Sequence, residues 1–118
     1  MNDFLLKHKD NRPVKNAYAY IHHVQSSDYL PAVPVTEIKN VMALPAHDGE
    51  RYTLLYGTIQ AWLDNQKHFC QRHADYNKNT TNIYEWSRWK CELMILEHIY
   101  TWDLMTVFEE LYGDGADV

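Results

Sequence analysis

The stretch Ile83–Leu111, which reads IYEWSRWKCELMILEHIYTWDLMTVFEEL, decides the fold of this chain. Seventeen of its 29 positions are apolar or aromatic, and three of these are tryptophan. On a helix these side chains surround most of the circumference instead of lining one stripe, and such a helix must bury most of its surface. We therefore expect one long helix here, buried in its own fold or against a partner.

A second long helix is expected just before it, because apolar side chains recur at helical spacing along one face while the other face is polar. The members of this stripe are Tyr52, Leu55, Tyr56, Ile59, Trp62, Leu63, Phe69, Cys70, His73 and Tyr76. Residues 77–80 have the composition of a turn, and Asn82 with Glu85 resembles a capping box. The two helices are therefore predicted to form an antiparallel hairpin.

The N-terminal third predicts shorter elements. Residues 13–25 fit a helix with Pro13 in its first turn, although Ala17–Ile21 also alternates as a strand does, and both alternatives stay open. Residues 1–12 are predicted to be a flexible arm or a short first turn.

Two caps are expected between these segments and the hairpin. Thr36 is predicted to cap a short helix from Glu37 to Leu44 that Pro45 ends, and Asp48 to cap the long helix that follows. The fold class is therefore all-α, as a small helical bundle built on a long antiparallel helical hairpin, in one domain over residues 1–118.

Composition points to a cytoplasmic protein without membrane contact. The N-terminus has no apolar run of signal-peptide length, and Glu97 and Asp103 interrupt the longest apolar candidate for a membrane span. Two cysteines without a signal peptide are typical of a reducing compartment.

Charge is unevenly distributed along the chain. Residues 1–90 hold all eleven Lys and Arg against nine acids, whereas residues 91–118 hold seven acids and neither Lys nor Arg. The acidic C-terminal segment is interpreted either as a solvated end without a specific role or as a surface that attracts a basic partner by its charge. Direct nucleic-acid binding by this end is disfavoured because it would repel phosphates.

The last predicted helix has two apolar faces. One face matches the stripe of the preceding helix, and the other is covered by the N-terminal helices or left as an exposed patch centred on Ile95, Ile99 and Trp102. An apolar centre with a polar rim is how interfaces are built. The full predicted interface is Glu92, Ile95, Ile99, Trp102, Asp103, Glu109 and Glu110.

No catalytic or phosphate-binding motif stands out, so we expect neither catalysis nor a cofactor. The nearest approach to a metal site is Cys70, His73 and Cys91, because hairpin symmetry places the two thiols at similar height. If these residues bind a metal ion, the protein would be a small metal-holding regulatory subunit or sensor. If they do not, the two cysteines are free buried thiols.

The preferred hypothesis is a non-enzymatic protein that inhibits or adapts a protein partner, including one with a basic nucleic-acid-binding surface. Small, acidic, aromatic-rich chains without motifs are common among immunity proteins and mobile-element inhibitors of host enzymes, an association by type alone. A third hypothesis is an obligate homodimer with a structural role.

Overall fold

The all-α prediction is confirmed. The computed structural model describes residues 3–45, 49–98 and 103–113, and across these ranges it contains helices and no strand. The helices are α1 (Asp3–Lys7), α2 (Arg12–Ser26), α3 (Val35–Met42), α4 (Gly49–Asn79), α5 (Ile83–His98) and α6 (Leu104–Tyr112). The molecule is elongated, with extents of 54 × 31 × 23 Å.

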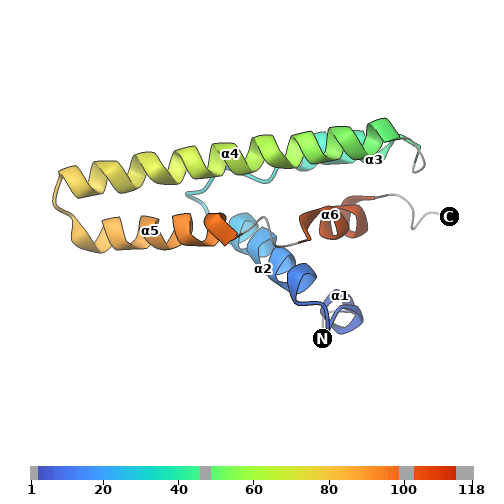
Figure 1. The fold of residues 1–118 in the computed structure, drawn as a ribbon, viewed down its shortest axis with the longest axis horizontal. Coiled ribbons are helices and arrows are strands. Elements are labelled where there is room, and N and C mark those ends of the chain that lie inside the picture. Colours follow the sequence, from blue (N-terminus) through green and yellow to red (C-terminus); the bar gives the residue numbers. More distant parts are fainter. Residues whose placement is uncertain (1–2, 46–48, 99–102, 114–118) are drawn as a thin grey trace.

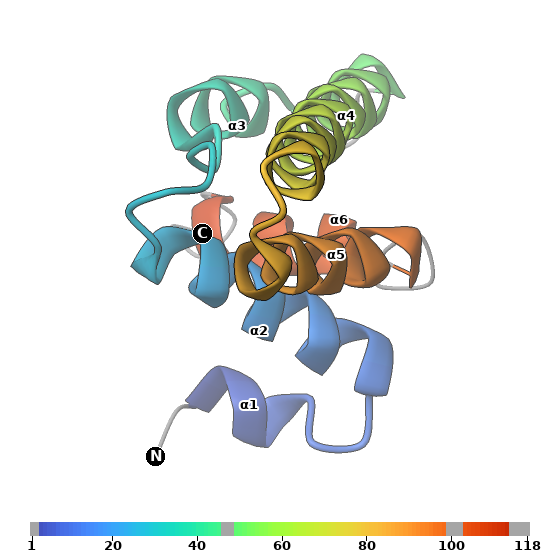
Figure 2. The same cartoon turned by 90° about the vertical axis from the view of Figure 1, so that its left-hand side faces the viewer.

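The predicted hairpin is present. Helices α4 and α5 lie side by side and run in opposite directions, and α5 covers only the half of α4 nearest the connecting turn (Figure 1). The other half of α4 packs against α3 and α6, while α2 and α1 lie below (Figures 1 and 2). One half of α4 thus belongs to the body of the bundle, and the other half extends from it.

The buried stripe of α4 differs in part from the predicted one. Its buried residues are Leu55, Ile59, Trp62, Gln66, Cys70, Ala74 and Asn77. The prediction was wrong for Tyr52, Tyr56 and Tyr76, which are exposed. The buried residues recur every three or four positions along one face of the helix. The polar residues Gln66 and Asn77 lie on that face and are buried, whereas the three tyrosines lie on either side of it.

The predicted single helix over 83–111 is wrong. Helix α5 ends at His98 and α6 begins at Leu104, with Asp103 as the N-cap of α6. The Asp103 carboxylate accepts hydrogen bonds from the Thr106 N–H at 3.0 Å and from the Thr106 hydroxyl at 2.7 Å. Aspartate favours this position because its oxygen satisfies an N–H group that the helix leaves free.

The break explains how so apolar a segment is buried. Helix α5 packs on α4, while α6 turns into the space between α2, α3 and α4. There Val107 and Phe108 are fully buried, and the Phe108 ring meets Trp62 edge to face at 5.9 Å between centroids. Two short helices with different neighbours can bury faces that one straight helix would leave exposed.

The structure decides between the helix and strand alternatives for the N-terminal segment. Residues 12–26 form helix α2, not a strand, and the side chain of Asn11 caps it by accepting from the Val14 N–H. Residues 3–7 form α1, where Phe4 stacks on Tyr18 at 4.6 Å.

The predicted boundaries of the next helix are wrong. Helix α3 begins at Val35, two residues early, and Pro34 takes the N-cap position without a side-chain bond, so Thr36 is not the cap. Proline suits the start of a helix because its fixed φ is already close to helical. The predicted cap Asp48 lies outside the described residues. No described helix combines the length and the apolarity that crossing a bilayer requires.

Candidate functional site

The free end of the hairpin, residues 76–84, is termed the hairpin tip. Thr80 and Thr81 form the turn there, and the Asn82 side chain accepts from the Glu85 N–H at 3.2 Å, as the capping prediction requires. Thr81 has φ 58°, which is sterically costly for a β-branched residue. The chain therefore turns tightly, at a cost in backbone strain.

Three large side chains at the hairpin tip stand in solvent. Tyr76 is 66% exposed, Ile83 72% and Tyr84 80%, and these are the largest exposed fractions among the large hydrophobic side chains that the structure describes. Keeping such a side chain out of a core forgoes roughly 1.5–3 kcal/mol of burial free energy. These three side chains therefore contribute little burial free energy to the stability of the fold.

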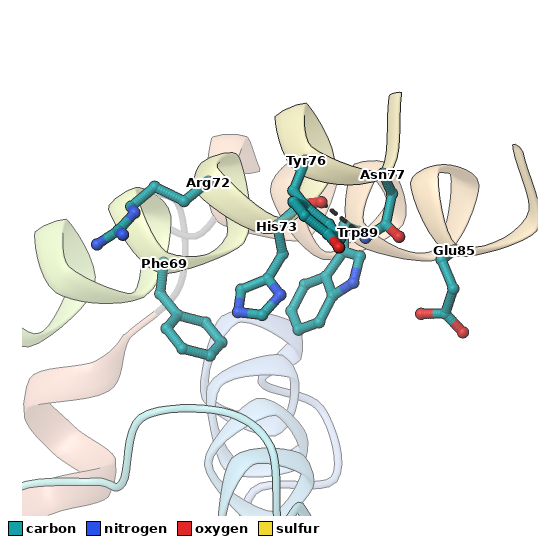
Figure 3. Close-up of a pocket in the computed structure, with 7 residues that line it drawn as sticks. All are labelled: Phe69, Arg72, His73, Tyr76, Asn77, Glu85 and Trp89. Atoms are coloured by element: carbon teal, nitrogen blue, oxygen red, sulfur yellow. Dashed lines mark hydrogen bonds between the residues drawn. The ribbon is translucent and has the colours of Figure 1, made fainter. Parts of the chain in front are cut away.

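An open pocket of about 620 Å³ lies beside the tip, between α4 and α5 (Figure 3). We term it the aromatic pocket. It is lined by Phe69, Arg72, His73, Tyr76, Asn77, Glu85 and Trp89. Its volume lies in the range typical of small-ligand and side-chain sites.

Three rings form the wall of the aromatic pocket. His73 stacks on Trp89 at 4.5 Å between centroids with 24° between planes, and Phe69 meets His73 at 4.5 Å and Trp89 at 5.8 Å. The Asn77 amide donates to the His73 carbonyl at 2.7 Å. Because each ring is held by the next, the wall is preorganised for contact with another flat apolar group.

Trp89 is held from a second side by the connector between α2 and α3. Tyr29 meets its ring edge to face at 5.5 Å, and the Arg88 guanidinium lies 4.3 Å from the centre of the Tyr29 ring. These contacts couple the pocket to the body of the bundle.

A polar cluster around the buried Glu92 carboxylate continues from Tyr29. The Glu92 carboxylate oxygen Oε1 lies 2.9 Å from His23 Nε2 and accepts from the Tyr29 hydroxyl at 3.2 Å. Its second oxygen, Oε2, is buried and has no hydrogen-bond partner within the described part of the chain. Burial, and to a smaller extent the Glu92 charge, raises the pKa of the neighbouring Cys70 thiol to about 12. Hydrogen bonds to the Glu92 carboxylate thus link α5 to α2 and to the connector between α2 and α3, and the neighbouring Cys70 thiol stays protonated at neutral pH.

The predicted interface is only partly brought together. Glu92 is 6% exposed, so the expectation that it forms an exposed rim is wrong, and Ile95 is half-buried against the core. Asp103 is occupied as a helix cap. Ile99 and Trp102 lie outside the described residues.

The two remaining acids of that interface differ from each other. Glu109 is exposed, whereas Glu110 lies 2.9 Å from His8 and 3.4 Å from Lys7 and so ties α1 to α6. Burial, the largest single effect, raises the pKa of the Glu110 carboxyl, but the contacts with His8 and Lys7 together outweigh it and lower that pKa. Glu110 thus has a structural role that the sequence did not indicate.

The alternative metal residues are not gathered into one site. Cys70 is buried and Cys91 is exposed. Within residues 3–45, 49–98 and 103–113 no three His, Cys, Asp or Glu side chains are grouped as metal ligands. His73 instead stacks on Trp89 in the aromatic pocket.

Sequence analysis did not identify the aromatic pocket as a site. The apolar stripe predicted for the first long helix includes Phe69, His73 and Tyr76 as core residues. A predicted stripe that ran through Gln66, Cys70 and Asn77 would have left Tyr76 outside the core. Such a stripe places two polar residues in the interior, which hydrophobic periodicity does not predict. No protein-family model, curated protein or solved structure matches this chain.

Proposed function

We propose that this protein acts without catalysis, by binding another protein through the hairpin tip and the aromatic pocket, and that it thereby inhibits or adapts that partner. One observation carries the proposal: Tyr76, Ile83 and Tyr84 stand in solvent at the hairpin tip, and Tyr76 also lines a pocket whose wall is formed by rings in mutual contact. Tyrosine and tryptophan are the side chains that most often dominate binding free energy at protein interfaces.

The geometry of the hairpin also favours this role. Its free end extends from the body, so a partner reaches it without contact with α1, α2 or α6 (Figure 1). The pocket wall is anchored through Tyr29 and Trp89, so little conformational entropy is lost when the surface becomes covered. The predicted centre at Ile95, Ile99 and Trp102 is replaced in this proposal, since Glu92 is interior and Ile95 is half-buried.

The test compares two exposed regions of the same hairpin. The tip variant carries Ile83→Ala and Tyr84→Ala, and the matched control is Tyr52→Ala at the other end of α4, where the side chain is 61% exposed. Each variant is immobilised and exposed to lysate of the native host. We expect the partner captured by the wild-type protein to be retained by the control and reduced at least about tenfold by the tip variant, which corresponds to about 1.4 kcal/mol or more.

Thermal unfolding by circular dichroism checks that both variants fold, which we expect because the altered side chains are exposed. Equal capture by the tip variant and the wild type would show that the binding surface lies elsewhere. Capture of a second copy of the chain, measured by mass in solution, would make the partner this protein itself.

A further inference from the structure

The two ends of the aromatic pocket differ in available charge. Figure 3 shows Arg72 at the Phe69 end and Glu85 at the opposite end, beyond Trp89. The Glu85 carboxylate is neutralised locally, since Oε2 lies 3.5 Å from Arg88 Nη1. Arg72 is exposed and makes no hydrogen bond or ion pair with any residue that the structure describes. The charge free to meet a ligand is therefore positive.

The outer half of the hairpin as a whole is basic within an acidic protein. Residues 67–90 carry five Lys and Arg against two acids, whereas the full chain has a net charge of −5. A local field of one sign attracts groups of the opposite sign and repels like charge. Carboxylate-rich surfaces are therefore favoured at this end of the molecule, and strongly basic ones are disfavoured.

The lining of the pocket indicates which chemical group a ligand would carry besides a carboxylate. The wall is made of the Phe69, His73 and Trp89 rings, and Tyr76 forms part of the lining toward solvent (Figure 3). Aromatic rings pack on such walls in offset or edge-to-face arrangements that add to the burial of apolar area. A guanidinium fork at the rim is suited to a planar carboxylate.

We propose that the aromatic pocket binds an aromatic side chain within an acidic segment of the partner protein, with the ring against the partly exposed Phe69 and His73 and a carboxylate on Arg72. This rests on the proposed function for the existence of a protein partner. The chemistry of the pocket is separately testable with small probes.

The test uses two probes that share a ring and differ in charge. 4-Hydroxyphenylacetate carries a phenol ring and a carboxylate, and tyramine carries the same ring and an ammonium. Each is titrated into the full-length ¹⁵N-labelled protein, and the indole N–H resonance of Trp89 is followed by NMR after assignment with Trp89→Phe. We expect the acid to bind with a Kd on the order of millimolar, and tyramine to bind at least about fivefold more weakly.

Two variants separate a direct contact from net charge. Arg72→Gln is expected to remove the preference for the acid, whereas Lys90→Gln, which removes the same charge from an exposed position on α5 outside the pocket, is expected to keep it. Equal losses in both variants would overturn the assignment to Arg72.

The remaining outcomes overturn the proposal in different ways. Tighter binding of tyramine would make the pocket a site for cations, in which the ring faces and Glu85 dominate. No shift of the Trp89 resonance with either probe would remove the pocket as a site for an aromatic acid. Neither result decides the proposed function, which depends on capture by the tip variant.

Discussion

The two halves of α4 share one helix and differ in what covers them. The body half is covered by α3 and α6, and its Trp62 meets the fully buried Phe108. The outer half is covered mainly by α5, through ring contacts of Phe69 and His73 with Trp89 that leave a pocket open. Exposed tyrosines occur in both halves, so exposure alone does not mark a site. What distinguishes the tip is exposure beside a preformed aromatic wall.

The largest expected effect separates the core of the body from the tip. Phe108→Ala removes a fully buried ring and should lower the free energy of unfolding by about 3–5 kcal/mol. Tyr84→Ala should change it by less than about 0.5 kcal/mol, because that ring is in solvent. Urea unfolding followed by circular dichroism measures both. Comparable losses would mean that the tip contributes to the folded core and would remove the contrast between the two halves.

The second prediction concerns Cys70, a buried thiol on α4 near the Glu92 carboxylate. Burial raises the pKa of this thiol from its ordinary value of 9.0 to about 12, so folding favours the protonated thiol. This stability is fully present below about pH 9 and is lost as pH rises toward 12. Between pH 8 and pH 10.5 the wild-type protein should lose about 1–2 kcal/mol more stability than Cys70→Ala does.

Urea unfolding at the two pH values measures this difference, because the comparison with Cys70→Ala removes the effects that both proteins share. A fixed offset between wild type and Cys70→Ala at both pH values would show that the thiol is not protected by burial.

The third prediction concerns the break that places α6 under the body half. Asp103→Ala removes the N-cap of α6 and should lower the free energy of unfolding by about 1 kcal/mol. Asp103→Asn is the matched control, since asparagine also caps helices and should preserve most of the stability. If both variants unfold like the wild type, a contact other than the cap determines where α6 begins.

Periodicity was sufficient to predict the helical class, the α4–α5 hairpin and much of the buried stripe, because these depend on the spacing of apolar residues. It did not predict the helix break at Asp103. Periodicity treats the whole apolar run as one helix, so a single capping residue within the run is not recognised as the start of a second helix. It also failed at Glu92, whose burial depends on His23 and Tyr29 from distant segments. The aromatic pocket was missed for a related reason. A sequence indicates which rings are apolar, whereas a hollow between them is a property of packing.

The smallest expected effect tests whether the turn of the hairpin stores strain. Thr81 has φ 58°, a conformation that costs a β-branched residue about 1–2 kcal/mol and glycine almost nothing. Glycine raises the entropy of the unfolded chain, which offsets about 0.4–1 kcal/mol of that gain. Glycine also loses the exposed hydrogen bond that the Thr81 hydroxyl donates to the Thr80 carbonyl at 2.6 Å. Thr81→Gly should therefore raise the free energy of unfolding by at most about 0.5 kcal/mol, as measured by urea unfolding.

Thr80→Gly is the neighbouring control and should have the opposite sign. Thr80 lacks the positive φ, and its hydroxyl donates to the Tyr76 carbonyl at 3.0 Å, so glycine there loses a bond and relieves no strain. If Thr81→Gly also leaves partner capture unchanged, the turn serves only to reverse the chain. If Thr81→Gly stabilises the fold but weakens capture, the strained turn positions Ile83 and Tyr84 for the partner, and backbone strain at the tip is part of recognition.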